Sequence, residues 1–298
     1  MADQNLSGIA YRLASVWALS SMGALIKLAE TRGAGLAELL FFRQSMAIPV
    51  VLLAAHSGPG LGSLKTGRFW AHTTRTMIGL SSMVLMFGTL LLLPLAEATT
   101  MQFTAPLFAT ILGAVALREP TGIHRWTAVL LGFAGILVVT QPGSGHIPLL
   151  GAMTGLSAAF LAAMVSILLR RLGQTEPATT IVFYFSLLSL PILAPFLWAT
   201  VKPHDPATWL ILCGIGLIGG VGQIAMTKSL TLAPVAVVVP MDYSGLIWAT
   251  IYGYLLFGVL PSASTWLGAP IIALSGLYIV WREQVRARKL TVAATVID

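Results

Sequence analysis

The chain has 298 residues, of which 57% are hydrophobic and only 9% are charged, and its formal net charge is +7. A water-soluble domain carries roughly 25% charged residues, so this composition excludes a soluble protein and places the chain in a lipid bilayer. Its single cysteine, Cys213, excludes an intrachain disulfide.

Apolar runs that are long enough to cross a membrane follow one another along the chain. About 20 helical residues cross the hydrocarbon core of a bilayer, and the connections between the runs are short and rich in Gly and Pro. We therefore predict an all-α integral membrane protein with ten transmembrane helices. The predicted spans are residues 8–28, 36–55, 69–92, 96–117, 124–140, 148–169, 179–198, 207–230, 234–256 and 264–281.

The charges between the spans predict the orientation. Cytoplasmic loops carry an excess of Lys and Arg. One side of the predicted bundle collects Arg12, Lys65, Arg68, Arg75, Arg118, Arg125, Arg170, Arg171, Lys228 and the basic tail, whereas the other side holds Arg32 and Lys202. We expect both termini to be cytoplasmic in a cell inner membrane. Anionic lipid headgroups account for the positive charge, so we expect no nucleic-acid partner.

An altered copy of residues 93–139 returns at residues 230–280. Leu93, Leu95 and Ala96 align with Leu230, Leu232 and Ala233, Pro49 aligns with Pro191, and Trp126 aligns with Trp266. This pattern predicts two five-helix repeats, residues 1–141 and 142–282, followed by a basic cytoplasmic tail at 283–298. Five spans per repeat place the second repeat upside down in the membrane. Inverted repeats are typical of transporters that open alternately to the two sides.

The frame of these repeats resembles a known family. The residues that carry the likeness are 95–96, Pro106, 117–121, 126–132 and 135–137. They are similar to those of the ten-helix EamA-type exporters of the drug/metabolite transporter superfamily, and most similar to the YddG-type exporters of aromatic and other neutral amino acids. The resemblance implies a basket of spans 1–4 and 6–9 around a central cavity, with spans 5 and 10 outside it. Val259 stands where family members usually carry Glu, so we expect Glu119 to cap a helix or to pair with Arg118 or Arg125.

Polar residues at membrane depth are the first candidates for function, because an unpaired charge there costs at least about 2.5 kcal/mol. Asp242 follows Pro240 in the ninth span and either lines the cavity or pairs with Arg43 or Lys228. Arg43 either clamps backbone carbonyls or contacts the solute. We expect Lys27 and Glu97, near helix ends, to extend towards the headgroups.

Helical spacing selects one face of each span around the predicted cavity. We predict that Trp17, Met83, Phe103 and Tyr243 receive an apolar side chain of the solute. Gln102, Gln223 and Ser244, together with Asp242 or Arg43, would meet its zwitterionic end, and Ser20 would line the same face. Pro106 and Pro240 are candidate hinges or ordinary kinks. Five glycines between Gly214 and Gly222 serve either close packing or a moving gate.

The predicted function is export of a small-molecule substrate, an amino acid or similar metabolite, by a monomer or weak homodimer in contact with membrane lipid. The alternatives are a related carrier of another metabolite or drug and a flippase for lipid-linked headgroups. A membrane-embedded enzyme is disfavoured because no nucleophile and base converge at one depth. No metal-ligand spacing or phosphate-binding loop occurs, so we expect no cofactor and no metal.

Overall fold

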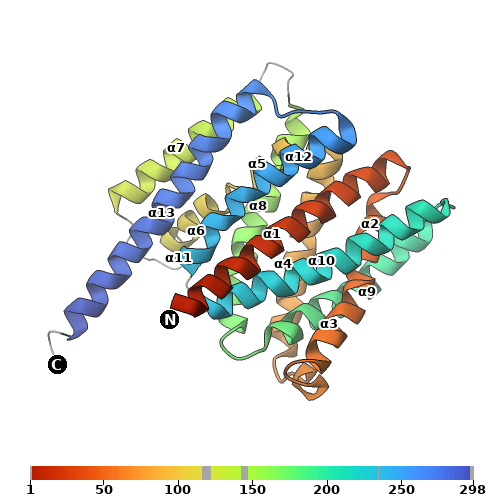
Figure 1. Ribbon diagram of the computed structural model, residues 1–298, viewed down its shortest axis with the longest axis horizontal. Coiled ribbons are helices and arrows are strands. Elements are labelled where there is room, and N and C mark those ends of the chain that lie inside the picture. The colour runs from red at the N-terminus through yellow and green to blue at the C-terminus, as the bar shows by residue number, and fades with distance from the viewer. Residues whose placement is uncertain (1, 116–121, 142–146, 234, 296–298) are drawn as a thin grey trace.

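The computed structural model describes residues 2–115, 122–141, 147–233 and 235–295, and all the regular elements in these ranges are helices (Figure 1). Nine segments of the described chain are long and apolar enough to span a membrane, and two of them, Leu36–His56 and Leu95–Val115, contain a short break. The remaining predicted span, 234–256, corresponds to residues 235–257, which form three short pieces. The predicted all-α membrane fold is therefore confirmed. Residues 117–121, with Glu119, lie outside the described residues.

The first repeat contains α1 (Ala2–Thr31), α2 (Leu36–Ser45), α3 (Ala47–His56), the 3-10 helix η1 (Leu61–Leu64), α4 (Phe69–Leu92), α5 (Leu95–Gln102), α6 (Ala105–Val115) and α7 (Ile123–Thr140). The second contains α8 (Leu149–Leu172), α9 (Ala178–Thr200), α10 (Pro206–Leu232), α11 (Val235–Val238), the 3-10 helix η2 (Val239–Ser244), α12 (Gly245–Phe257) and α13 (Ala263–Thr295). Because α13 continues to Thr295, the predicted tail begins as an extension of the tenth span.

Three spans are interrupted, and a proline explains each interruption. Proline lacks the N–H that would donate to the carbonyl four residues earlier. That carbonyl belongs to Ser45 for Pro49 and to Gln102 for Pro106, the last residues of α2 and α5. In the ninth span Pro240 lies inside η2, between α11 and α12. The sequence pointed to Pro106 and Pro240, and the structure adds the break before Pro49.

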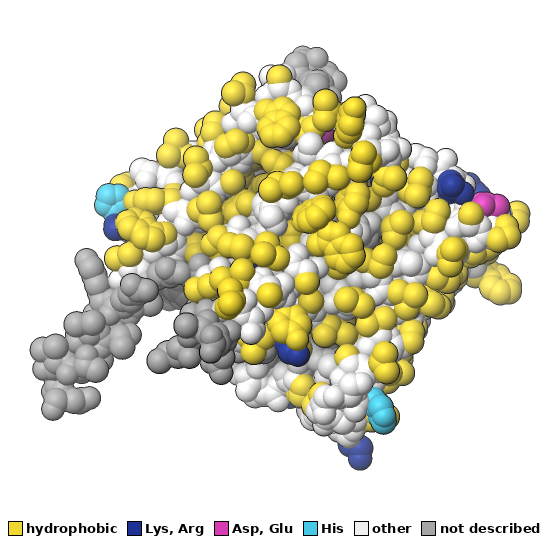
Figure 2. Space-filling view, viewed as in Figure 1, with side chains coloured by type: hydrophobic (Ala, Val, Ile, Leu, Met, Phe, Trp, Pro, Cys, Tyr) yellow, Lys and Arg dark blue, Asp and Glu magenta, His cyan; other side chains and the backbone are white. Residues whose placement is uncertain are grey.

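The spans place the loops in two groups. The chain ends and the loops at residues 57–68 and 173–177 lie on one side of the bundle, which we call the terminal side. The loops at 32–35, 93–94, 201–205 and 258–262 lie on the other, which we call the opposite side. Apolar side chains cover the face between them, and charged side chains gather at its edges (Figure 2). Trp198 and Trp70 are 88% and 79% exposed, which fits a protein whose outer surface contacts lipid.

Helix contacts divide the bundle into two matching units. In unit A, α1 packs along α10 and against η2 and α12. In unit B, α8 packs along α4 and against α5 and α6. Exchanging each span for its counterpart in the other repeat converts one set of contacts into the other. The symmetric pairs α2–α9 and α7–α13 complete the bundle, and α7 and α13 lie side by side at its edge (Figure 1).

Glycines allow the closest helix contacts. A Cβ on Gly268 would lie 2.7 Å from the carbonyl oxygen of Gly135, so the backbones of α7 and α13 nearly touch. A Cβ on Gly216 would lie 2.3 Å from the carbonyl oxygen of Phe42, where α10 crosses the break between α2 and α3. Small residues at membrane helix contacts have this role. At these positions the close-packing alternative accounts for the glycines.

Two arginines that entered the loop-charge count lie inside spans instead. Arg12 is 8% exposed in α1, and Arg75 is 3% exposed in α4. The charge count assigns an arginine to one side of the membrane by its distance along the sequence from the end of a span. Burial of its side chain depends instead on which helices pack around it. Both residues therefore leave the topology argument and enter the description of the interior.

Candidate solute-binding site

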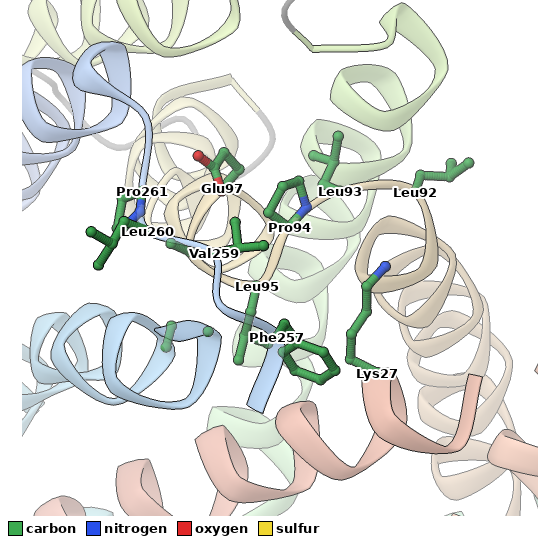
Figure 3. Close-up of a pocket in the computed structure, with 13 residues that line it drawn as sticks. Lys27, Leu92, Leu93, Pro94, Leu95, Glu97, Phe257, Val259, Leu260 and Pro261 are labelled. Carbon is green, nitrogen blue, oxygen red and sulfur yellow. The ribbon is translucent and has the colours of Figure 1, made fainter. Parts of the chain in front are cut away.

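A cavity of about 240 Å³ lies on the opposite side, between units A and B. Unit A contributes Lys27 from α1 and several residues of α12 and the loop that follows it, whereas unit B contributes the turn from α4 into α5. Lys27 reaches from α1 towards that turn (Figure 3), and its Nζ donates to the Leu91 carbonyl at 3.1 Å. The lining is Lys27, Leu92, Leu93, Pro94, Leu95, Ala96, Glu97, Ala249, Gly253, Phe257, Val259, Leu260 and Pro261.

Glu97 at the edge of this cavity does not extend to the headgroups as expected. It is 4% exposed, and its Oε1 accepts from the Ser262 amide and the Thr265 hydroxyl, each at 3.1 Å. These donors lie at the start of α13, where backbone N–H groups have no partner within the helix. The expectation was wrong because the neighbouring helix end offers Glu97 buried donors.

The two breaks of spans four and nine meet inside the bundle. The rings of Phe103, which follows α5, and Tyr243, in η2, lie 4.9 Å apart in an edge-to-face arrangement. The Tyr243 hydroxyl lies only 1.9 Å from the position that a Cβ on Gly276 of α13 would occupy, and no described residue forms a hydrogen bond with it. The structure thus brings together two residues that the sequence predicted for one site, and it directs the Tyr243 hydroxyl towards α13.

Further towards α9 lies a cluster of buried polar side chains. Arg43 is 1% exposed, and its guanidinium donates to Gln44 Oε1 at 2.5 Å and to Gln223 Oε1 at 3.2 Å. Gln44 Nε2 donates to the Ser189 hydroxyl of α9 at 2.9 Å. The structure therefore joins two predicted residues, Arg43 and Gln223, through a direct hydrogen bond.

Arg75 completes this cluster. Its guanidinium carbon lies 3.7 Å from the centroid of the Phe185 ring, and that of Arg43 lies 5.7 Å from the same centroid. A cation over an aromatic face gains electrostatic attraction. Gly79, one turn further along α4, leaves room for the guanidinium, because a Cβ there would lie 2.7 Å from Arg75 NH1. Arg43 and Arg75 thus both lie close to the Phe185 ring.

Asp242 has a partner that the sequence did not suggest. Its carboxylate forms a two-pronged ion pair with Arg12, in which Nε donates to Oδ1 at 2.6 Å and NH2 donates to Oδ2. The predicted partners lie elsewhere: Arg43 is bound to Gln44 and Gln223, and Lys228 lies over the Tyr11 ring. Both members of the pair belong to unit A, so the pair fastens η2 to α1.

The other predicted site residues are more scattered. Trp17 is 50% exposed on α1. Ser20 is partly buried on the same helix, and Met83 packs on the main apolar core. Gln102, at the end of α5, has a buried Nε2 for which the described part of the chain offers no acceptor. The Ser244 hydroxyl donates to the Met241 carbonyl at 2.6 Å, so its hydrogen atom is already used in a bond to the backbone of η2.

Sequence reasoning missed Gln44, Arg75 and Phe185 as members of the interior cluster. Arg75 lies seven positions into the run that begins at Phe69, which is deeper than a headgroup anchor needs to be. The alignment of Pro49 with Pro191 also pairs Arg43 with Phe185, because the spacing is the same. Among the described residues, no group of three or more metal-ligating side chains occurs.

Comparison with known proteins decides the family. The EamA-like transporter family matches residues 6–141 and 149–282, which is nearly the whole chain. The chain belongs to the EamA-like transporter family. As an EamA-like transporter it is a multi-pass membrane protein that moves small molecules. The resemblance to this family is confirmed, and the finer likeness to YddG-type amino acid exporters stays a prediction.

Three relatives of this EamA-like transporter illustrate the range of solutes. It is 32% identical over 231 residues to a riboflavin transporter of Vibrio cholerae, with 76% of each chain covered. It is 26% identical to a pseudopaline exporter of Pseudomonas aeruginosa, covering 90% of this chain and 94% of that one. It is 28% identical to an S-adenosylmethionine uptake transporter of Rickettsia felis, covering 94% of each. A crystal structure at 21% identity, with a TM-score of 0.61 over 94% of this chain and 97% of that chain, shares the fold.

Proposed function

We propose that this EamA-like transporter exports aromatic and other neutral amino acids across the cell inner membrane by alternating access, with both termini in the cytoplasm. The observation that carries the proposal is the division into units A and B, which are exchanged by the inverted repeat and enclose a cavity of about 240 Å³ on one side. A relative movement of two such units closes one side while it opens the other.

The breaks in the fourth and ninth spans support this movement. Residues between α5 and α6, and between α11 and α12, lack a continuous ladder of backbone hydrogen bonds. Such positions bend at lower cost than a regular helix. Phe103 and Tyr243 lie at these two breaks and contact each other. In the proposal, Pro106 and Pro240 are hinges, and the contact between the two rings changes as the units move.

The interior residues support an amphiphilic solute. Phe103, Tyr243 and Met83 supply aromatic and polarisable surface, with Trp17 and Ser20 on the facing helix, whereas Arg43 and Gln223 supply a charged and polar end. Gln102, Asp242 and Ser244 lie close to the breaks and complete the proposed zwitterion site. The relatives are named for both uptake and export, so the direction of transport is also part of the proposal.

A second candidate function is riboflavin transport, which is favoured by the 32% identity to the Vibrio cholerae protein. The aromatic contact between Phe103 and Tyr243 suits a flat ring system as well as it suits an aromatic amino acid. The two candidates differ in the solute and share the mechanism, so one assay distinguishes them.

Purified protein in proteoliposomes tests both candidates. Vesicles would be loaded with radiolabelled phenylalanine, riboflavin or S-adenosylmethionine, and solute release would be followed against protein-free vesicles. We expect faster release of phenylalanine, and slower release after Tyr243→Ala or Asp242→Ala than after Trp198→Ala, whose side chain is 88% exposed. Faster release of riboflavin alone would replace the amino acid proposal, and release at the protein-free rate for all three solutes would contradict both candidates.

A further inference from the structure

We infer that Arg43 and Arg75 form a binding site for an anionic group, a carboxylate or a phosphate, between units A and B. The inference rests on the proposed transport function and names the substrate class: a solute that carries at least one negative group. Both side chains are almost completely buried, 1% and 3% exposed. A guanidinium remains protonated in proteins, so this interior holds two positive charges.

The hydrogen bonds of the two guanidinium groups are incomplete. Arg43 Nε, Arg75 Nε and Arg75 NH1 are buried without an acceptor among the described residues. Within the described part of the chain, Arg43 donates to two neutral glutamine oxygens, and the Arg75 guanidinium lies over a phenyl ring. Buried donors without acceptors carry a free-energy cost, and an anion can accept from several of them at once.

The carboxylates whose side chains the structure describes do not neutralise these arginines, because each of them has partners elsewhere. Asp242 binds Arg12, Glu38 contacts His204, and Glu97 binds Ser262 and Thr265. The rest follow the same pattern: Glu30 pairs with Lys27, Glu176 binds Thr66, and Asp205 caps α10. A buried charge is normally paired with an opposite charge. The contrast with Arg12 shows that this chain supplies such a partner where the charge is structural.

The position of the cluster explains what such an anion does. Arg75 belongs to unit B, and Gln223, which binds Arg43, belongs to unit A; Arg43 and Phe185 lie on the α2–α9 pair between the units. Both guanidinium carbons lie within 5.7 Å of the centroid of the Phe185 ring. The two positive charges are therefore close enough to repel each other. An anion that binds both arginines removes the repulsion and joins the units.

The test compares two buried arginines by thermal unfolding of detergent-purified protein. Arg75→Gln removes an unpaired charge, so the melting temperature without added anion stays equal or rises. Arg12→Gln, the matched control, leaves Asp242 without its partner, so the melting temperature falls. Equal losses in the two variants would overturn the inference, because they would mean that Arg75 has a structural role like that of Arg12.

Added ligands give the second readout. The probes are phenylalanine, benzoate and inorganic phosphate, with phenylalaninamide as the uncharged-carboxyl control. We expect at least one anionic probe to raise the melting temperature of the wild type by several degrees, and the amide to raise it less. In Arg75→Gln the Kd for that probe rises about tenfold or more. Arg75→Lys keeps the positive charge but loses the forked donor geometry of the guanidinium, so its Kd rises less. The inference is contradicted if no anion stabilises the wild type, or if anions stabilise Arg75→Gln as much as the wild type.

Failure of this inference and failure of the proposed function give different results. Release of phenylalanine, which carries a carboxylate, at the same rate by the wild type and Arg75→Gln would remove the anion site and keep the transporter mechanism. Anion binding that depends on Arg75, without solute release above the protein-free rate in proteoliposomes, would keep the site and contradict the proposed function.

Discussion

Buried arginines are the most demanding residues of this interior, and each has a different environment. Arg12 has a full counter-ion in Asp242. Arg43 has the amide oxygens of Gln44 and Gln223. Arg75 has the face of Phe185. Since transfer of an isolated charge from water into a protein is strongly unfavourable, these three environments predict three different responses to substitution.

The Arg12–Asp242 pair predicts a strong coupling between the two residues. Arg12→Gln and Asp242→Asn should each lower stability by about 1–3 kcal/mol, the lower part of the range for a broken buried pair because Asp242 is 36% exposed. The double variant should lose less than the sum of the single losses. Thermal unfolding of all four proteins measures this coupling, and strictly additive losses would mean that the pair does not stabilise η2.

At the scale of the helices, the contacts of α10 depend on the absence of side chains at particular positions. Gly216 lies against the break between α2 and α3. Gly214, half a turn away on the same helix, would place a Cβ no closer than 3.6 Å to Leu25. Gly216 therefore has no room for a side chain, whereas Gly214 has room for a methyl group, although the sequence around the two glycines is similar.

These two glycines predict opposite results for the same substitution. Gly216→Ala forces α10 away from the Phe42 carbonyl and should lower stability by about 1–3 kcal/mol. Gly214→Ala meets ordinary van der Waals distances and should raise it by up to about 1 kcal/mol, because alanine favours the helix. The melting temperatures of the two variants check this, and a destabilised Gly214→Ala with a neutral Gly216→Ala would contradict the described packing of α10.

The breaks predict an effect on rate rather than on stability. Pro106→Ala supplies the N–H that can donate to the Gln102 carbonyl, so α5 and α6 should join into a stiffer helix and solute release should slow several-fold. Pro195→Ala is the matched control, because Pro195 lies inside the uninterrupted α9. Release from proteoliposomes measures both. If the two variants release solute equally fast, Pro106 is a kink and not a hinge.

At the scale of the whole molecule, much of the fold could be predicted because it depends on run length and composition. Apolar runs such as residues 69–92 coincide with α4, and Pro106 and Pro240 marked two breaks. The break before Pro49 was missed. By contrast, Pro191, which aligns with Pro49, and Pro195 lie within an uninterrupted α9. A proline alone therefore does not determine whether a span breaks.

The interior site was less predictable, because its partners come from distant parts of the chain. Arg12 and Asp242 are separated by 230 positions, and no local spacing connects them. Arg75 was counted with the loop charges, although it lies seven positions into its span. Phe103, Tyr243 and Gln223 were predicted from helical spacing, and Arg43 from its depth in the second span. Helical spacing indicates the inward face of a helix but not the neighbour that this face meets.

Alternating access requires units A and B to move relative to each other, and a reversible cross-link tests this movement. In a Cys213→Ser background, Gly23→Cys and Leu95→Cys join the units, since a Cβ on Gly23 lies 3.5 Å from Leu95 Cδ1. Gly8→Cys and Ala233→Cys form a control link within unit A. We predict that a short thiol cross-linker stops solute release only in the first pair and that reduction restores it. Undiminished release from fully cross-linked Gly23→Cys/Leu95→Cys protein would contradict alternating access between these units.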